Sequence, residues 1–326
     1  MKGVTDMSLG RVLVEEFQPA VLQWLRERAE VVIVNPWVEP ERWDTEVCRV
    51  DAVISRKGKI TREHMAKAGG RLKLIARTGV GVDPSRVDLE AAEELKIWVT
   101  NQPGSNAVSV AELVFGQIIA LARRTHEANR AVRENRWSEY LKFTGTELAG
   151  KTLGIVGMGN IGARVALRAR AFDMALLVHD PYIPESHVTA LGGRWVGLKE
   201  LLAKSDFVTI HCPLNQETKG MIGAEELALL KPSAYLLNAA RGGIADEQAL
   251  LEALRQKKIH GAALDVMADE PPAKDHPLLK LDNVLWTPHL GAMTLEAAQR
   301  GEWGAAEDVI RVLEGKRPKH PVVGPT

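Results

Sequence analysis

Three glycines in the middle of the chain have the spacing that suits phosphate binding. Gly157, Gly159 and Gly162 follow the apolar run 153–156, and residues 163–171 after them are mostly helix formers. A strand, a G-x-G-x-x-G turn and a helix in this order make a dinucleotide-binding unit, because the glycines allow a tight turn, close approach to a pyrophosphate and close helix packing. The helix N-terminus favours the phosphates. The pattern predicts a dinucleotide site; an ordinary glycine-rich turn is the alternative.

An acidic residue follows at the position where such a unit needs one. The apolar segment 175–178 is followed by His179 and Asp180, and Asp180 lies near the ~20-residue offset expected for the ribose-binding acid. A carboxylate there would bind the free 2′-hydroxyl of an adenosine ribose and repel a 2′-phosphate. We therefore expect NAD rather than NADP, and we interpret His179 as a polar rim residue.

Three side chains near expected strand ends in the second half of the chain could carry hydride-transfer chemistry. Transfer between an alcohol and NAD needs a base for the hydroxyl proton and a cation for the substrate's negative charge. His289 would take the proton, and Glu270 would orient the imidazole and stabilise its protonated form. Arg241 would hold a carboxylate through its planar fork. On spacing alone, a structural histidine and an Arg–Glu ion pair remain the alternative.

Two loops in the first third of the chain could bind an anion. One is a glycine-rich turn in which Asp83 would cap a helix that has Pro84 at its first position. The backbone N–H groups around Val80 and Gly81 could also form a nest for a carboxylate, and the two interpretations are compatible. The other loop is the basic cluster 56–59, which would bind a substrate anion or, as charge runs more often do, remain solvated.

Strands and helices alternate along both halves of the chain, which predicts parallel sheets covered on both faces. In the first part we expect strands over residues 11–15, 30–34, 51–55, 72–77 and 97–100, and helices over residues 19–29, 61–68 and 85–95. A linker at 101–104 precedes an apolar helix over 108–124 and a less regular arm, 125–150, that could contact a second subunit or be a surface crossover. Further strand-and-turn segments cover 206–213, 233–242, 260–272 and 283–289, before a last helix over 294–314.

The composition indicates an ordinary protein of two domains. The chain has 326 residues, with 42 Lys and Arg against 42 Asp and Glu, so no overall charge favours nucleic acid or an anionic membrane. Cys48 and Cys212 form neither a disulfide framework nor a metal-ligand pattern, so we expect no metal, a cytoplasmic protein and an apolar role for Cys212. No run approaches the ~18 apolar residues of a membrane helix.

Several blocks together resemble the D-isomer-specific 2-hydroxyacid dehydrogenase family over nearly the whole chain. The matching blocks are residues 79–83, 110–112, 145–150, 152–162, 211–214 with Thr218, 238–242, 264–266 with Glu270 and Pro271, and 287–289. The resemblance implies an α/β fold of two Rossmann-like, doubly wound parallel-sheet domains with a cleft between them. Residues 1–104 and 293–326 would form a discontinuous substrate domain, and residues 105–292 the NAD-binding domain.

The resemblance also implies an activity and its residues. The reaction would be hydride transfer between a D-2-hydroxy acid and NAD to give the 2-oxo acid, with Arg241, Glu270 and His289 as catalytic residues. The implied NAD-binding residues are Gly157, Gly159, Asn160, Ile161, Gly162, Asp180, His211, Cys212, Pro213, Thr218, Ala239, Ala240, Asp265, His289 and Gly291. The substrate contacts would be Ser55, Val80, Gly81, Arg241 and His289. A homodimer would form through the helix 108–124 and the arm after it.

The order of the blocks is most similar to phosphoglycerate dehydrogenases without a regulatory domain, which makes D-3-phosphoglycerate a candidate substrate. Two departures, Arg56-Lys57 where those members tend to show Arg-Ser and residues 83–85 where they show Asp-Asn, leave the distal group open. Glyoxylate or hydroxypyruvate reduction is the alternative, although Asp180 argues against the NADP use common there. Glu270, where related formate dehydrogenases carry Gln, disfavours formate oxidation. An NAD-sensing corepressor is a further alternative, disfavoured because the chain shows no extension for partner contacts.

Overall fold

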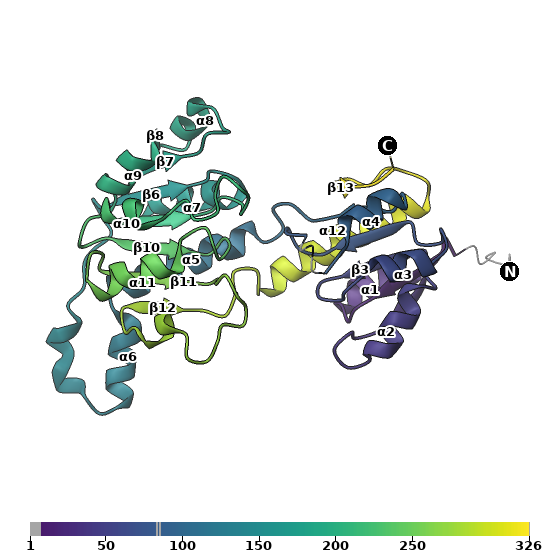
Figure 1. Cartoon of the computed structure of the whole chain (residues 1–326), viewed down its shortest axis with the longest axis horizontal. Helices are drawn as coiled ribbons and strands as arrows, with labels where there is room; N and C mark the ends of the chain where they lie inside the picture. The colour runs from purple at the N-terminus through teal and green to yellow at the C-terminus, as the bar shows by residue number, and fades with distance from the viewer. Residues whose placement is uncertain (1–7, 83, 85, 326) are drawn as a thin grey trace. The chain divides into compact units, whose positions relative to one another are not determined.

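The structure, a computed structural model, describes residues 8–82, 84 and 86–325 (Figure 1). It divides into two compact units. Unit 1 consists of Met1–Asn106 together with Met293–Thr326, and unit 2 is Ala107–Ala292. The first unit is therefore discontinuous in the sequence, and the chain passes through the whole of unit 2 before returning to complete it.

Unit 1 is built on a six-stranded sheet in the order β13-β5-β4-β3-β1-β2. Its strands are β1 (Arg11–Val14), β2 (Glu30–Ile33), β3 (Ala52–Ser55), β4 (Leu74–Arg77), β5 (Trp98–Thr100) and β13 (Pro321–Val323). Its helices are α1 (Pro19–Arg26), α2 (Pro40–Val47), α3 (Arg62–Lys67), α4 (Leu89–Glu94) and α12 (Leu295–Leu313). All neighbouring strands are parallel except β13, which pairs antiparallel with β5.

Helices cover both faces of this sheet. Because alternate residues of each strand point to opposite sides, successive residues of a strand contribute to two different cores. On one face Val12 and Ile54 pack with α1 and α12, and on the other Leu13 and Val53 pack with α2, α3 and α4. A continuous apolar run is the expected sequence of such a strand, and β1 and β3 show it.

Unit 2 is built on a seven-stranded, wholly parallel sheet in the order β12-β11-β10-β9-β6-β7-β8. Its strands are β6 (Thr152–Val156), β7 (Ala175–His179), β8 (Arg194–Trp195), β9 (Phe207–Ile210), β10 (Tyr235–Asn238), β11 (Gly261–Leu264) and β12 (Val284–Trp286). Its α-helices are α5 (Ala107–Ala122), α6 (Thr125–Arg133), α7 (Asn160–Ala171), α8 (Glu185–Ala190), α9 (Leu198–Lys204), α10 (Ala224–Ala228) and α11 (Glu247–Arg255). Two 3₁₀ helices, η1 (Trp137–Phe143) and η2 (Pro277–Lys280), complete it.

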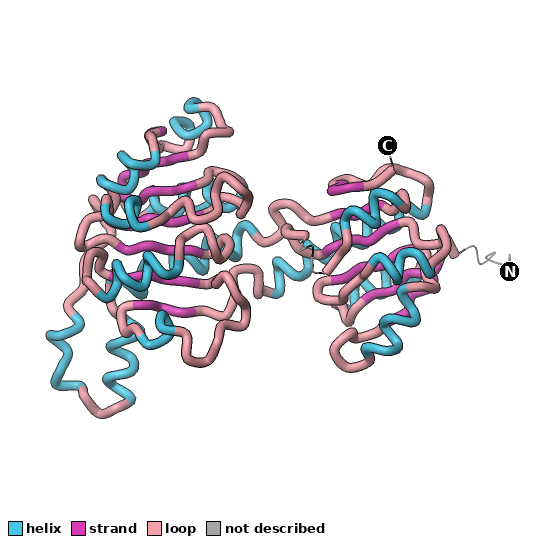
Figure 2. The backbone as a smooth tube through the Cα atoms, in the orientation of Figure 1, coloured by secondary structure: helices cyan, strands magenta, loops and turns pink. Residues whose placement is uncertain are grey.

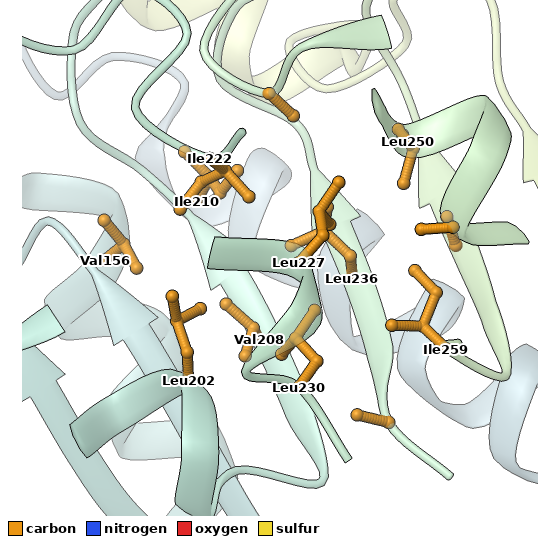
Figure 3. Close-up of a cluster of buried hydrophobic side chains, with 14 of the residues drawn as sticks. Val156, Leu202, Val208, Ile210, Ile222, Leu227, Leu230, Leu236, Leu250 and Ile259 are labelled. Carbon is orange, nitrogen blue, oxygen red and sulfur yellow. The ribbon is translucent and has the colours of Figure 1, made fainter. Parts of the chain in front are cut away.

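Two apolar cores cover the faces of this second sheet. Helices α5 and α7 pack on one face, and α9, α10 and α11 pack on the other, where Val208 and Leu236 lie among the buried side chains of Figure 3. The alternation of strands and helices within each unit can be followed in Figure 2. The predicted α/β class with two doubly wound sheets is confirmed.

Some predicted elements differ from the structure. The helix predicted over 85–95 begins only at Leu89, because Asp88 caps it by accepting a hydrogen bond from the Ala91 N–H and Val87 is held in a bridge with Ile60. The predicted cap Asp83 lies outside the described residues. The first sheet, expected to be wholly parallel, also contains β13, an antiparallel strand that the sequence patterns did not predict. The sequence patterns did not predict helices α2 and α6, because both are short and rich in polar and charged residues.

Candidate active site

The carboxyl ends of the strands in unit 2 form one edge of its sheet, and β6 lies between β7 and β9. The chain runs from β6 outward through β7 and β8, and then returns to the other side of β6 to form β9. Open α/β sheets bind ligands at such a reversal of strand order. The predicted nucleotide and catalytic residues of this unit lie at these strand ends, in the loops that follow them, or in the first turn of α7.

The glycine turn connects β6 to α7 at this reversal. Gly157 has a φ of +93°, and a Cβ added there would lie 2.6 Å from the backbone nitrogen of Cys212. A Cβ at Gly162 would lie 2.2 Å from the carbonyl oxygen of Gly157, so both positions require glycine. At Gly159, a Cβ would meet nothing within 4 Å, and no side chain caps α7. The turn therefore leaves the helix N-terminus, with Asn160 and Ile161, accessible to an anion.

Asp180 lies beside this turn, at the end of β7. Its Oδ2 accepts a hydrogen bond from the Met158 N–H at 2.8 Å, and its Oδ1 accepts one from the Tyr182 N–H at 2.9 Å. These bonds fix the carboxylate against the backbone of the glycine turn. The structure thus brings together the two features that predicted a dinucleotide site.

The loop after β9 forms the other wall of the reversal. The backbone of His211 and Cys212 meets Gly157, and Thr218 donates a hydrogen bond to the carbonyl of Pro213 at 2.6 Å, which closes the loop. Desolvation lowers the pKa of His211 to about 3, since its Nδ1 is buried without a hydrogen-bond partner among the described residues. Burial raises the pKa of Cys212 to about 11, so the thiol stays protonated and behaves as a small apolar group.

The turn after β10 carries Arg241. The buried side chain of Asn238 braces it, donating to the Arg241 carbonyl at 2.8 Å and accepting from the Ala240 N–H at 3.0 Å. Arg241 itself is exposed, whereas the two preceding residues, Ala239 and Ala240, are buried. A Cβ at Gly242 would lie 1.9 Å from the Met267 carbonyl carbon, so this turn packs directly on the loop after β11.

His289 and Glu270 meet in unit 2. The Nδ1 of His289 lies 2.6 Å from Oε2 of Glu270, and the other carboxylate oxygen, Oε1, accepts a hydrogen bond from the Met267 N–H at 3.1 Å. The His289 side chain is 48% exposed. Its φ is +53°, a left-handed backbone conformation that costs a non-glycine residue on the order of 1 kcal/mol or more and recurs at functional sites.

Asp265 fixes the loop that carries His289. It is 2% exposed, and its Oδ1 accepts from the Thr287 hydroxyl at 2.6 Å and the Leu290 N–H at 2.7 Å. Its Oδ2 accepts from the Gly291 N–H at 2.9 Å, and its carbonyl accepts from the His289 N–H at 2.8 Å. The carboxylate predicted to meet the nicotinamide therefore also organises residues 287–291.

In unit 1, the loop after β3 is held by the carboxylate of Glu15, a residue that no sequence motif marks. Oε1 of Glu15 accepts hydrogen bonds from the Ser55 hydroxyl at 2.7 Å and from the N–H groups of Arg56, Lys57 and Gly58 at 3.0, 2.8 and 2.8 Å. Successive backbone N–H groups of this kind form an anion-binding nest. Here the chain's own glutamate fills the nest, and Ser55 is fully buried beneath it.

The other residues predicted to contact substrate lie around this loop or after β4. The Arg56 guanidinium is 3.5 Å from Glu302, a 4% exposed carboxyl whose pKa is raised by burial and lowered in part by the Gln18 N–H and by Arg56. Lys57 and Lys59 are exposed, as a solvated cluster would be. Val80 is partly exposed and Gly81 is exposed.

Two residues of these networks escaped prediction. Glu15 follows an apolar strand directly, which is a signal for a strand-end polar site. Gln117 in α5, which donates to Thr287, is a polar residue inside an apolar helical pattern. Neither signal identifies its partner, because the hydrogen bonds join residues 40 or more positions apart.

The residues of unit 2 fit a dinucleotide. An open cradle at Gly159, an uncapped helix N-terminus and a carboxylate at the next strand are the groups that a pyrophosphate and a ribose need. Within the described residues, no group of three or more His, Cys, Asp or Glu side chains is placed to hold a metal ion. The described helices also include none with the length and apolarity to span a membrane.

Comparisons with known proteins identify the family. The model of the D-isomer specific 2-hydroxyacid dehydrogenase NAD-binding domain matches residues 115–291. A hydroxypyruvate reductase of Thermotoga maritima is 40% identical over 293 residues, which cover 89% of this chain and 94% of that protein. The NAD-dependent formate dehydrogenase of Staphylococcus aureus, solved in complex with NAD, is 33% identical, with a TM-score of 0.81 over 97% of this chain and all of that one.

A D-3-phosphoglycerate dehydrogenase of Methanocaldococcus jannaschii is 44% identical over 294 residues, which cover 90% of this chain but 55% of that protein. The chain thus spans about half the length of the phosphoglycerate dehydrogenases it matches. The matched domain confirms NAD as the cofactor class predicted from the glycine turn and Asp180, and the resemblance drawn from the sequence blocks is confirmed as well. The chain belongs to the D-isomer specific 2-hydroxyacid dehydrogenase family.

Proposed function

We propose that the chain is an NAD-dependent D-2-hydroxyacid dehydrogenase. The observation that carries the proposal is the 2.6 Å contact between His289 and Glu270, at the same sheet edge as the glycine turn of an NAD-binding domain. A histidine paired with a carboxylate at a cofactor-binding edge is the arrangement that a proton transfer coupled to hydride transfer requires.

The paired groups define their own roles. An ionised carboxylate only accepts hydrogen bonds, so the N–H of this pair is on Nδ1 of His289 and donates to Glu270. The other ring nitrogen, Nε2, then keeps its lone pair. Nε2 takes the proton of the substrate hydroxyl, and Glu270 stabilises the imidazolium that results. The exposed guanidinium of Arg241 holds the substrate carboxylate. NAD, when bound, supplies the hydride acceptor.

The cofactor contacts follow the strand order of the sheet. Asp180 after β7 would hold the adenosine ribose, and the turn with Gly159 and the first turn of α7 would hold the pyrophosphate. The loop at Cys212 would lie under the adenosine, and Ala240 and Asp265 would meet the nicotinamide. Unit 2 is accordingly the proposed NAD-binding domain and unit 1 the proposed substrate domain.

The tail of the substrate has two candidates. D-3-phosphoglycerate is supported by 44% identity to the archaeal phosphoglycerate dehydrogenase, and hydroxypyruvate by 40% identity to a hydroxypyruvate reductase that the chain matches over nearly its whole length. Glyoxylate stays beside hydroxypyruvate in the second candidate, as the sequence resemblance implies. The filled nest at residues 56–58 favours the second candidate, because its backbone donors are already bonded to Glu15. Ser55, Val80 and Gly81 remain predicted substrate contacts.

The test is oxidation of NADH, followed by absorbance, with glyoxylate, hydroxypyruvate, phosphohydroxypyruvate, sulfopyruvate and pyruvate. We expect turnover with at least one acid and weaker turnover with NADPH. Preference for a phosphorylated or sulfonated acid would assign the basic cluster 56–59 to a distal anion. Absence of turnover with every acid, together with tight NADH binding, would instead support the corepressor-like alternative.

We also propose that the chain forms a homodimer. Exposed apolar side chains cluster in the arm after α5, where Trp137, Tyr140 and Leu141 are 73%, 65% and 71% exposed. Several large apolar side chains exposed within one short segment are typical of interaction sites. Sedimentation equilibrium should give twice the chain mass of 35.7 kDa, and a Leu141→Asp variant should shift the equilibrium toward monomer.

A further inference from the structure

A buried amide in helix α5 is the starting observation. Gln117 is 2% exposed, and its helical neighbours Val114, Ile118 and Leu121 are buried apolar side chains. Burying an amide without hydrogen bonds is unfavourable, so its position among apolar residues calls for a polar partner.

Only one end of this amide is satisfied within the described residues. The Nε2 of Gln117 donates to the Thr287 hydroxyl oxygen at 3.0 Å, whereas its Oε1 is buried without a hydrogen-bond partner there. A half-satisfied amide contributes less to stability than an apolar side chain of similar size. The presence of Gln117 is therefore better explained by its hydrogen bond to Thr287 than by a contribution to the stability of the core.

Thr287, the partner of Gln117, also bonds to Asp265, which holds the loop that carries His289. A hydroxyl has one proton, and because Thr287 accepts from Gln117 it uses that proton for Oδ1 of Asp265, at 2.6 Å. Gln117 thus fixes the direction of the Thr287 hydroxyl. The same carboxylate accepts from the N–H groups of Leu290 and Gly291.

The relay ends at the catalytic histidine. The N–H of His289 donates to the Asp265 carbonyl at 2.8 Å, so Asp265 contacts the loop before, at and after His289. Because His289 has a φ of +53°, the surrounding bonds must hold it in a conformation that it would not adopt alone. Loosening any of them lets the imidazole move away from its productive position.

We propose that Gln117 is a positioning residue for the reaction: acting through Thr287 and Asp265, it fixes the loop 287–291 and so the imidazole of His289. The inference rests on the proposed function, since it takes His289 as the group that accepts the substrate proton. Gln117 does not need to touch substrate or cofactor.

The first test replaces the amide with an apolar side chain of similar length in the full chain. We expect Gln117→Met to lower kcat by about tenfold, because small displacements of a catalytic group are costly, while Tm stays level or rises because the orphaned Oε1 is gone. A residue with a merely structural role would not separate kcat from Tm in this way. Ile118→Met in the same helix is the matched control and should leave kcat within about twofold.

A second pair of variants tests the relay without altering the helix. Thr287→Ser keeps the hydroxyl and should keep kcat, whereas Thr287→Val should lose as much as Gln117→Met. The double variant Gln117→Met/Thr287→Val should be no slower than Thr287→Val alone, because both changes break one chain of contacts.

The outcomes separate the two proposals. An active wild type whose Gln117→Met and Thr287→Val variants keep full kcat overturns the positioning role and leaves the proposed function standing. A wild type that reduces no 2-oxo acid overturns the proposed function, and the positioning role with it.

Discussion

The loops at the carboxyl ends of the strands differ between the two sheets in whether their backbone N–H groups have an acceptor. In unit 2, the turn after β6 leaves the α7 N-terminus without a side-chain cap, and Gly159 has open space in front of it. In unit 1, the loop after β3 bonds three successive N–H groups to the carboxylate of Glu15. The strand ends of one sheet therefore leave backbone N–H groups open to an external anion, whereas those of the other sheet have their N–H groups bonded to the protein's own carboxylate.

The difference teaches where specificity can arise. The open helix N-terminus binds the pyrophosphate group that dinucleotide cofactors have in common, so it carries no information about the substrate. A filled nest gives the loop at Ser55 a fixed shape, because four donors meet on a single oxygen of Glu15. We expect changes in unit 2 to affect catalysis and cofactor binding, and changes around Glu15 to affect stability and substrate choice.

The largest expected effect tests whether the edge of unit 2 carries the chemistry. His289→Ala should lower kcat by roughly 10²- to 10⁴-fold, as expected for a lost general acid and base, with NADH still bound. Steady-state rates with the best 2-oxo acid measure this. His187→Ala, at an exposed position of α8, is the control. Near-normal turnover of the His289 variant would remove that residue from the proposed role.

The next prediction alters the glycine turn between β6 and α7 by the same substitution, glycine to alanine, at two positions. Gly162→Ala places a Cβ 2.2 Å from the Gly157 carbonyl, which should distort the turn, cost about 1–3 kcal/mol of stability and weaken NADH binding. Gly159→Ala should fold normally, because its Cβ meets nothing within 4 Å, yet weaken NADH binding if the pyrophosphate lies there. Urea unfolding and NADH fluorescence titration measure both. Undiminished NADH affinity of both variants would place the pyrophosphate elsewhere.

The corresponding change in unit 1 empties the filled nest. Glu15→Ala should lower the free energy of unfolding by about 1–3 kcal/mol, because the N–H groups of Lys57 and Gly58 lose their acceptor. NADH affinity should not change. Glu16→Ala, the same substitution at the next and exposed residue, should have little effect on stability. Equal stability of the two variants in urea would mean that Glu15 does not hold the loop.

The smallest effect concerns pH and the reversal between β6 and β9. Desolvation lowers the pKa of His211 from 6.5 to about 3 in the folded chain, so the unfolded chain binds more protons between these values. The buried neutral imidazole does not lower the free energy of unfolding above about pH 6.5. As the pH falls from 6.5 toward 3, protonation of His211 in the unfolded chain lowers that free energy progressively. Between pH 7 and 5 the wild type should lose about 1–2 kcal/mol more than His211→Gln. Parallel pH profiles of the two proteins in urea unfolding would contradict the shift.

Local patterns predicted the elements whose signals lie within a few residues. The spacing of Gly157, Gly159 and Gly162, the buried strands and the strand-end positions of Asp180 and His289 all follow from the period of apolar residues and from turn chemistry. The caps of α3 and α12, Thr61 and Thr294, likewise lie at the start of the predicted helices. The α/β fold class could accordingly be predicted from local patterns, whereas the family was identified from the resemblance of its sequence blocks.

Long-range partners could not be predicted in this way. Glu15 and Ser55 are 40 residues apart, and Gln117 and Thr287 are 170 residues apart, so only the folded chain shows that they meet. The start of α4 was placed too early because the bridge between Ile60 and Val87, two distant residues, keeps the chain extended up to Asp88. Tertiary pairing overrode the local signal in that case.

The most direct test of the account follows the hydride itself. NADH deuterated at both C4 positions would be incubated with the chain and the best of the 2-oxo acids whose reduced product has a stereocentre at C2, which leaves out glyoxylate. The product would be analysed by mass spectrometry and chiral chromatography. The account predicts one deuterium at C2 of a product with the D configuration, formed at least 10²-fold more slowly by His289→Ala. A product of L configuration, a product without deuterium, or no product from any acid would contradict it.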